Sequence, residues 1–186
     1  MRTSMFATVV LAGGLVGCAG ISVTTDFDPD VDLTQYETFA WMEGSGSGSG
    51  DIRATGDLVD QRFRRAIESE LASRGLQKAT SGAPDMFVGY QLALDDKVDY
   101  QTMNTYYGSG WGYRGVYRGV GVGTQTYTTE YTMGTLVIDV FDGARHELVW
   151  RGAGEGKVSE ARNPQERQEK INEAVELILA EFLPGR

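Results

Sequence analysis

Apolar residues recur at every third or fourth position in the segment that follows residue 56. The repeating positions are Val59, Phe63, Ile67 and Leu71, with Ala66 beside them. Because an α-helix completes a turn every 3.6 residues, this spacing places the apolar side chains on one face. We expect Asp57 to cap the N-terminus of this helix and Gly75 to end it in a left-handed conformation.

A second apolar stripe runs from residue 164 to residue 183. Asn163 is expected to cap this helix, with Pro164 at its first position and Glu166 reaching back to the backbone N–H of Asn163. The stripe consists of Ile171, Ala174, Val175, Ile178, Leu179 and Phe182. The pattern therefore predicts two amphipathic helices, one near the middle of the chain and one at its end.

The remaining apolar residues gather in short runs rich in β-branched and aromatic side chains, which favour strands. In residues 86–94, Met86, Val88, Tyr90, Leu92 and Leu94 take every second position, which is typical of a strand with one strongly apolar face. We expect strands at 21–25, 36–42, 86–94, 98–103, 125–131, 135–141 and 146–158. Asp95-Asp96 and Asp142-Gly143 are expected to form turns between neighbouring strands. Consecutive strands joined by turns predict a mainly antiparallel sheet, with the two helices on one face. The predicted fold class is thus α+β, a two-layer sandwich.

Two segments interrupt these patterns because of their glycine content. Residues 44–50 alternate Gly and Ser, a composition typical of a flexible coil. Residues 106–123 mix glycine with tyrosine, tryptophan and arginine, and we expect them to form an irregular loop. Both segments are predicted to lie within a single domain that spans residues 18–186.

The first 17 residues have the pattern of a bacterial lipoprotein signal peptide. Arg2 gives a positive start, an apolar stretch too short to span a membrane follows, and Gly17 precedes Cys18, the single cysteine of the chain. Cleavage before Cys18 would allow its thiol to carry a diacylglyceryl group and its new amino group to carry an acyl chain such as palmitate. Two or more chains hold a protein firmly to a membrane. Ala19 occupies the position where aspartate often marks retention in the inner membrane, so the outer membrane, on its periplasmic side, is the expected location.

The net charge of −9 limits the classes of partner. An acidic protein repels phosphate backbones, which argues against nucleic acid. It also repels anionic lipid, so the N-terminal lipid is expected to provide the attachment to the membrane.

Several motifs resemble a known family of bacterial lipoproteins. They are the Cys18 segment, residues 23–29, 36–41, 134–140 and 148–152, and the final amphipathic helix. Together they resemble the uncharacterised lipoprotein family called domain of unknown function 4136, over most of the mature chain. These motifs are structural in character, and the resemblance implies no activity, ligand or catalytic residue.

One acidic segment matches part of a calcium-binding template. Asp26, Asp28, Asp30 and Glu37 fall on its first, third, fifth and twelfth positions, with Thr34 on the ninth. Val31 replaces the glycine that the sharp turn of such a loop requires, and a strand rather than a helix is expected to precede it. We therefore favour an acidic connector and keep a small-ligand or calcium-binding lipoprotein as the alternative function.

No arrangement of residues in the sequence predicts catalysis. His146, the single histidine, lies beside a predicted turn, and the cysteine is assigned to lipid. We expect a protein without cofactors that is not an enzyme.

The candidate partner-binding residues come from the Gly/Tyr segment and the strand that follows it. They are Trp111, Tyr113, Arg114, Tyr117, Arg118, Tyr127 and Tyr131. Aromatic and arginine side chains are common at interfaces, and glycine lets a loop adapt to a partner. The sequence thus predicts an envelope protein that binds another envelope protein or maintains the envelope. The alternative for the Gly/Tyr segment is a mobile hairpin tip that has no partner.

Overall fold

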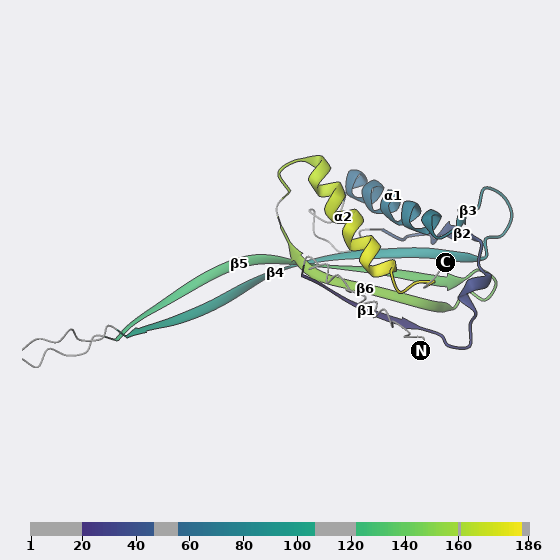
Figure 1. The fold of residues 1–186 in the computed structure, drawn as a ribbon. Coiled ribbons are helices and arrows are strands. Elements are labelled where there is room, and N and C mark those ends of the chain that lie inside the picture. The colour runs from purple at the N-terminus through teal and green to yellow at the C-terminus, as the bar shows by residue number, and fades with distance from the viewer. Residues whose placement is uncertain (1–19, 47–55, 107–121, 160, 184–186) are drawn as a thin grey trace, which may run out of the picture.

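The computed structural model of the chain describes residues 20–46, 56–106, 122–159 and 161–183, with the backbone alone at 100–106 and 122–127. Its elements are β1 (Ile21–Phe27), a 3-10 turn η1 (Leu33–Gln35), β2 (Thr38–Trp41), α1 (Asp57–Ser73), β3 (Gln77–Lys78), β4 (Met86–Tyr106), β5 (Val122–Asp142), β6 (Leu148–Val158) and α2 (Pro164–Leu179). They form one six-stranded sheet in the order β1-β6-β5-β4-β2-β3. Both helices cover the same face of this sheet (Figure 1). The predicted α+β class with two helices on one face is confirmed.

The sheet is mixed rather than wholly antiparallel. The strands β1, β6, β5 and β4 pair antiparallel, whereas β2 runs parallel to both β3 and β4. The parallel pairs follow from α1, which carries the chain back across the sheet between β2 and its neighbours, as parallel pairing requires. The sequence prediction did not include β3 or these parallel pairs.

The core lies between the sheet and the two helices. The apolar stripe of α1 is buried at Phe63, Ala66, Ile67 and Leu71, and that of α2 at Val175, Ile178 and Leu179. They pack against alternate residues of the strands, chiefly Met86, Val88, Tyr90, Leu136, Ile138, Val140 and Trp150. The helical period therefore predicted the buried faces of the two helices, and the alternation over residues 86–94 predicted the buried face of β4.

The ends of the helices differ from the prediction in detail. Gly56 occupies the cap position of α1, so the expectation that Asp57 caps this helix is wrong, and Asp57 is instead its first residue. Gly75 has φ of 84° and follows the end of the helix, as predicted. Asn163 caps α2 by accepting a hydrogen bond from the N–H of Glu166 at 2.8 Å. The carboxylate of Glu166 accepts from the N–H of Arg162 at 2.9 Å, one residue before the expected donor.

Alternate glycines on β6 let α2 approach the sheet closely. A Cβ atom on Gly152 would lie 2.3 Å from Cη2 of Trp150 and 2.7 Å from Cγ2 of Ile178. A Cβ atom on Gly154 would lie 2.7 Å from Cδ1 of Ile178. The glycines thus provide the space that the Trp150 ring and the Ile178 side chain occupy.

β4 and β5 are each continuous over 21 residues. The expected turn at Asp95-Asp96 is therefore wrong, because Asp95 pairs with Met133 and Asp96 with Thr132 inside the ladder. The turn at Asp142-Gly143 is confirmed, since β5 ends at Asp142 and Asp142 Oδ1 accepts hydrogen bonds from the N–H groups of Ala144 and Arg145. Where β4 and β5 pass the ends of the other strands, they continue as a two-stranded arm beyond the body of the domain (Figure 1).

Candidate functional site

The arm consists of residues 97–106 of β4 and 122–131 of β5. Lys97 pairs with Tyr131 at its base, and Tyr106 pairs with Val122 at its outer end. At a rise of about 3.3 Å per residue, the arm is about 30 Å long. The ladder of β5 with β6 ends at Thr132, and that of β4 with β2 ends at Val88. In the described part of the chain, no strand pairs with the outer edge of either arm strand.

Every residue of β4 and β5 that is buried, among those whose side chains the structure describes, belongs to the body. These residues are Met86, Val88, Gly89, Tyr90, Leu136, Ile138, Asp139 and Val140. A ribbon of two strands is marginally stable by itself in water and presents unpaired N–H and C=O groups along both edges. These properties make the arm the element of the fold best suited to contact something else.

Two of the predicted partner-binding residues, Tyr127 and Tyr131, fall on the arm. Trp111, Tyr113, Arg114, Tyr117 and Arg118 lie outside the described residues, as does Cys18. The backbone of Tyr127 pairs with that of Gln101 on the arm. Tyr131 lies at the base, where the ammonium group of Lys157 sits 4.1 Å from the centre of its ring. The structure thus places Tyr127 and Tyr131 on the same ribbon.

The acidic connector does not form a cation site in the described structure. Asp28 Oδ1 accepts a hydrogen bond from the N–H of Asp30, and Asp32 Oδ1 accepts from the N–H and hydroxyl groups of Thr34. Asp26 belongs to β1, and Glu37 lies beyond η1. Nowhere among the described residues do three or more His, Cys, Asp or Glu side chains gather as they would around a metal ion.

The contacts of His146 stabilise a turn. It follows the turn after β5 with φ of 57°, a left-handed conformation that is uncommon outside glycine. Its ring stacks on Phe87 with centroids 5.2 Å apart, and its N–H donates to the carbonyl of Asp142. This contact holds the hairpin against the face of the sheet that carries no helix.

The helix-free face also carries a shallow groove and an ion pair between a buried carboxylate, Asp139, and a half-exposed arginine, Arg151. Asp139 is 6% exposed and pairs with Arg151 on the neighbouring strand. Nearby, a groove of about 330 Å³ is bordered by Gly44, Gly46, Gln91, Leu92, Ala93, Thr135 and Val137. Gly46 donates a hydrogen bond to the carbonyl of Tyr90, which fixes this border to β4.

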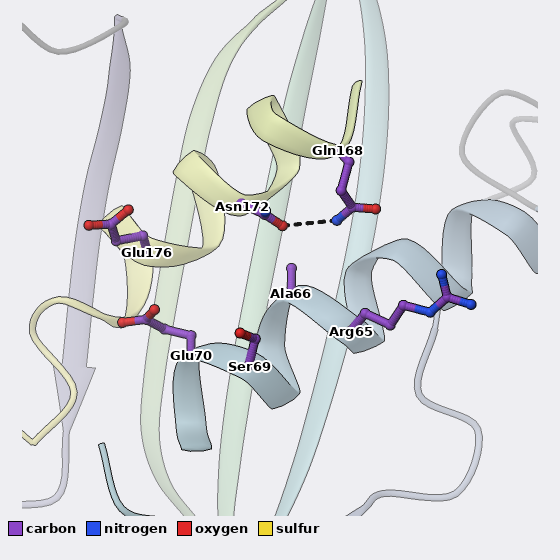
Figure 2. A pocket seen from close by; sticks show the side chains of 7 residues that line it. All are labelled: Arg65, Ala66, Ser69, Glu70, Gln168, Asn172 and Glu176. Carbon is purple, nitrogen blue, oxygen red and sulfur yellow. Dashed lines mark hydrogen bonds between the residues drawn. The ribbon is translucent and has the colours of Figure 1, made fainter. Parts of the chain in front are cut away.

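A wider, polar groove lies between the two helices. It has a volume of about 500 Å³ and is lined by Arg65, Ala66, Ser69, Glu70, Gln168, Asn172 and Glu176. Figure 2 shows these side chains projecting from α1 and α2, with the amide of Gln168 donating to Asn172 Oδ1. The lining combines one arginine with two carboxylates and neutral polar groups, and does not define a single ligand chemistry.

Two buried tyrosines have strongly shifted pKa values. Burial, together with the hydrogen bond from its hydroxyl to Asp142, raises the pKa of Tyr36 to about 12. Burial, and then the 2.7 Å hydrogen bond from its hydroxyl to Asp60, raises the pKa of Tyr90. Both tyrosines connect the sheet to neighbouring segments, so their shifts report structural hydrogen bonds.

A family model described as Domain of unknown function (DUF4136) matches residues 23–184, which cover nearly all of the described domain. The chain belongs to the DUF4136 family. The resemblance of residues 23–29, 36–41, 134–140 and 148–152 to this family is therefore confirmed. No curated protein matches the sequence.

Two solved structures are similar in outline to this DUF4136 domain. One is a PDZ domain protein from Parabacteroides distasonis, with 15% identity and a TM-score of 0.49; the match covers 89% of this chain and 37% of that one. A second is the PelC dodecamer from Paraburkholderia phytofirmans, with 9% identity and a TM-score of 0.47. That match covers 86% of this chain and 95% of the PelC chain. The chain thus spans little more than a third of the PDZ domain protein.

The sequence signal for the arm was present but was interpreted as two strands separated by turns. Residues 98–103 and 125–131 were expected as strands, and both belong to the arm. The missing information was their register, which makes them continuations of the strands of the body.

Proposed function

We propose that this DUF4136 protein is a lipid-anchored protein of the bacterial outer membrane that faces the periplasm. The supporting observation is the signal-peptide pattern that ends at Cys18, three residues before the first strand begins at Ile21. No helix in the described part of the chain has the length and apolar character needed to cross a membrane. In this proposal, lipid on Cys18 supplies the attachment.

We infer further that the protein is not an enzyme and acts by binding, as an interaction or envelope-maintenance module. The observation that carries this inference is the arm, a ribbon of about 30 Å whose two outer edges pair with no other strand in the described part of the chain. Edges of this kind bind by backbone pairing, and side chains on either face of the ribbon add specificity.

The partners of the titratable side chains support a non-catalytic role. His146 stacks on Phe87, Tyr36 donates to Asp142, and Asp85 accepts hydrogen bonds from the N–H and hydroxyl groups of Thr38. Each of these contacts stabilises a turn or the start of a strand.

Two variants test this function. Cys18→Ser should abolish labelling by a fatty-acid probe and release the protein from the membrane fraction, because the thiol that receives the lipid is gone.

Replacing residues 97–131 with Asn-Gly, a pair that favours a tight hairpin, should remove the arm and retain the body. In crosslinked intact envelopes, the arm-less protein should lose the adducts that the full chain forms. Undiminished fatty-acid labelling of Cys18→Ser contradicts the anchor, and undiminished adducts of the arm-less protein contradict the role of the arm.

A further inference from the structure

We propose that the arm lies along the surface of the membrane that holds the lipid anchor, with its uncharged outer strands against the lipid headgroups. This inference rests on the proposed lipidation of Cys18. It adds a lipid contact for one face of the arm and leaves both edges of the ribbon open for the strand pairing proposed above.

The first step is the position of the start of β1. Ile21 pairs with Gly156 on β6, Gly156 pairs with Gly134 on β5, and Gly134 pairs with Leu94 on β4. The arm begins at Lys97, three residues farther along β4. Figure 1 shows that β1 starts at the end of the body from which the arm projects. The anchor and the base of the arm therefore lie at the same end of the domain.

The second step is a comparison of lengths. Cys18 is three residues before Ile21, so even a fully extended connection holds Ile21 within about 10 Å of the lipidated residue. The arm is about three times as long as this connection. An arm directed straight at the membrane would pass through the headgroup region, which is about 6 Å thick on each side, and enter the hydrocarbon. Its unpaired backbone edges would there lose their hydrogen bonds to water, at a cost of several kcal/mol for each group.

The opposite orientation is excluded by the body. From the start of β1, the body extends in the direction opposite to the arm (Figure 1). An arm directed away from the membrane would therefore force the charged body into the bilayer. With the anchor at the base of the arm, the remaining orientation places the arm along the surface, where water still reaches its edges.

The third step is the charge of the arm. The chain contains 26 Asp and Glu residues, yet none lies in 100–106 or 122–129, which carry no Lys or Arg either. The carboxylates stop at the base, at Asp95, Asp96, Asp99 and Glu130. The outer strands thus avoid the repulsion that anionic lipids exert on an acidic protein. Their sequence also includes Tyr100, Tyr106 and Tyr127, and tyrosine is enriched at headgroup depth in membrane proteins.

Fluorescence quenching in vesicles tests this orientation. The lipidated chain would carry one added cysteine, either Thr102→Cys on the arm or Ser22→Cys beside the anchor, and each would be labelled with a small fluorophore. The thioether at Cys18 does not react with the label. Vesicles of phosphatidylethanolamine and phosphatidylglycerol would contain a lipid with a nitroxide on its headgroup. Quenching at Thr102 is expected to be within about twofold of that at Ser22, because both sites lie near the headgroups.

The reference states separate this inference from the proposed function. The same labels on unlipidated Cys18→Ser chains give the level of quenching in free solution. If the lipidated protein floats with the vesicles and Ser22 is quenched, but Thr102 stays at the free-solution level, the arm is held away from the lipid and the inference is overturned, while the anchor stands. If a chain with Cys18 intact takes up no fatty-acid probe and does not float, the proposed anchor and this inference both fail.

Discussion

Arg151 lies directly opposite Asp139 on neighbouring strands, and its guanidinium group donates to both carboxylate oxygens, at 2.6 and 2.9 Å. Asp139 is almost fully buried, although it lies on the face of the sheet without helices. On its other side Asp139 pairs with Gly89, where the segment around Met42 and Ser45 packs over the sheet. The pair therefore satisfies a buried carboxylate at the middle of the sheet.

Removing the arginine of this pair should destabilise the fold. Arg151→Ala leaves the Asp139 carboxylate without its two hydrogen bonds, and we expect a loss of about 1.5–3 kcal/mol in the free energy of unfolding. The double variant Asp139→Ala/Arg151→Ala should be less destabilised than Arg151→Ala, because no buried charge remains. Urea denaturation of wild type, the two single variants Asp139→Ala and Arg151→Ala, and the double variant measures this difference. Additive effects of the two substitutions would show that the pair does not interact as described.

Adding a methyl group to the glycines of β6 should push α2 away from the sheet. Gly154→Ala places a Cβ atom 2.7 Å from Cδ1 of Ile178, and overpacking of this kind costs about 1–3 kcal/mol. Ile178→Val removes Cδ1 but keeps Cγ1, which lies 2.8 Å from the same Cβ position, so the double variant Gly154→Ala/Ile178→Val should recover only a small part of the lost melting temperature. Gly20→Ala is the matched control, because a Cβ atom at Gly20 meets nothing within 4 Å. Equal melting temperatures for Gly20→Ala and Gly154→Ala would contradict the close packing of α2.

The buried hydroxyl of Tyr36 should make stability fall at alkaline pH. The pKa of Tyr36 is raised to about 12 in the folded protein, against about 10 in the unfolded chain. Folding therefore favours the protonated phenol, and this contribution is present below about pH 10 and is lost as the pH rises toward 12. Tyr36→Phe should lose about 1 kcal/mol at neutral pH and show a shallower decline above pH 10. Denaturation at several pH values above about 10 measures how steeply the free energy of unfolding falls with pH. An equal decline in wild type and Tyr36→Phe would assign the alkaline loss to other groups, such as Tyr90.

Asp85 should contribute to stability against acid. Its carboxylate accepts hydrogen bonds from the Thr38 hydroxyl and from the N–H groups of Glu37 and Thr38, and these hold its pKa below the usual value. The lowered pKa means that this contribution is present above about pH 4 and is lost as the pH falls through the folded-state pKa. Asp85→Asn should therefore be less stable at pH 7 and lose less stability between about pH 5 and pH 3. Denaturation of both proteins at about pH 5 and pH 3 measures this loss. An equal loss of unfolding free energy in wild type and Asp85→Asn would contradict this role.

Removing the arm should leave the body folded. The variant with Asn-Gly in place of residues 97–131 retains every buried core residue, so its melting temperature should lie within a few degrees of wild type. Far-ultraviolet circular dichroism should still show the helices of the body. A loss of cooperative unfolding would show that the arm is required for folding.

The predictable part of this protein was set by local patterns. The buried stripe of α2, with Val175, Ile178 and Leu179, followed from apolar residues at helical spacing, and its start followed from Asn163 and Pro164. The buried face of β4 followed from the alternation over residues 86–94. In each case the relevant interactions lie within one turn or within one strand, so a short window of sequence contains them.

The features that sequence reasoning missed depend on register between distant segments. Asp95-Asp96 has the composition of a turn, yet pairing with Thr132 and Met133 keeps the strand straight and creates the arm. In the sequence, Gly152 and Gly154 are only small residues within a strand. That they leave room for the side chains of Trp150 and Ile178 becomes visible only when α2 is placed against the sheet.

The sequence by itself determined the two helices, the faces that they bury, the acidic character of the chain and a signal-peptide pattern ending at Cys18. Tertiary structure alone decided that β2 runs parallel to β4, that β4 and β5 extend together past the body, and that Ile21 lies beside the base of this arm. The physical reason is the range of the interactions. Helical periodicity acts over a few residues, whereas strand register is fixed by hydrogen bonds and packing among segments that are dozens of residues apart.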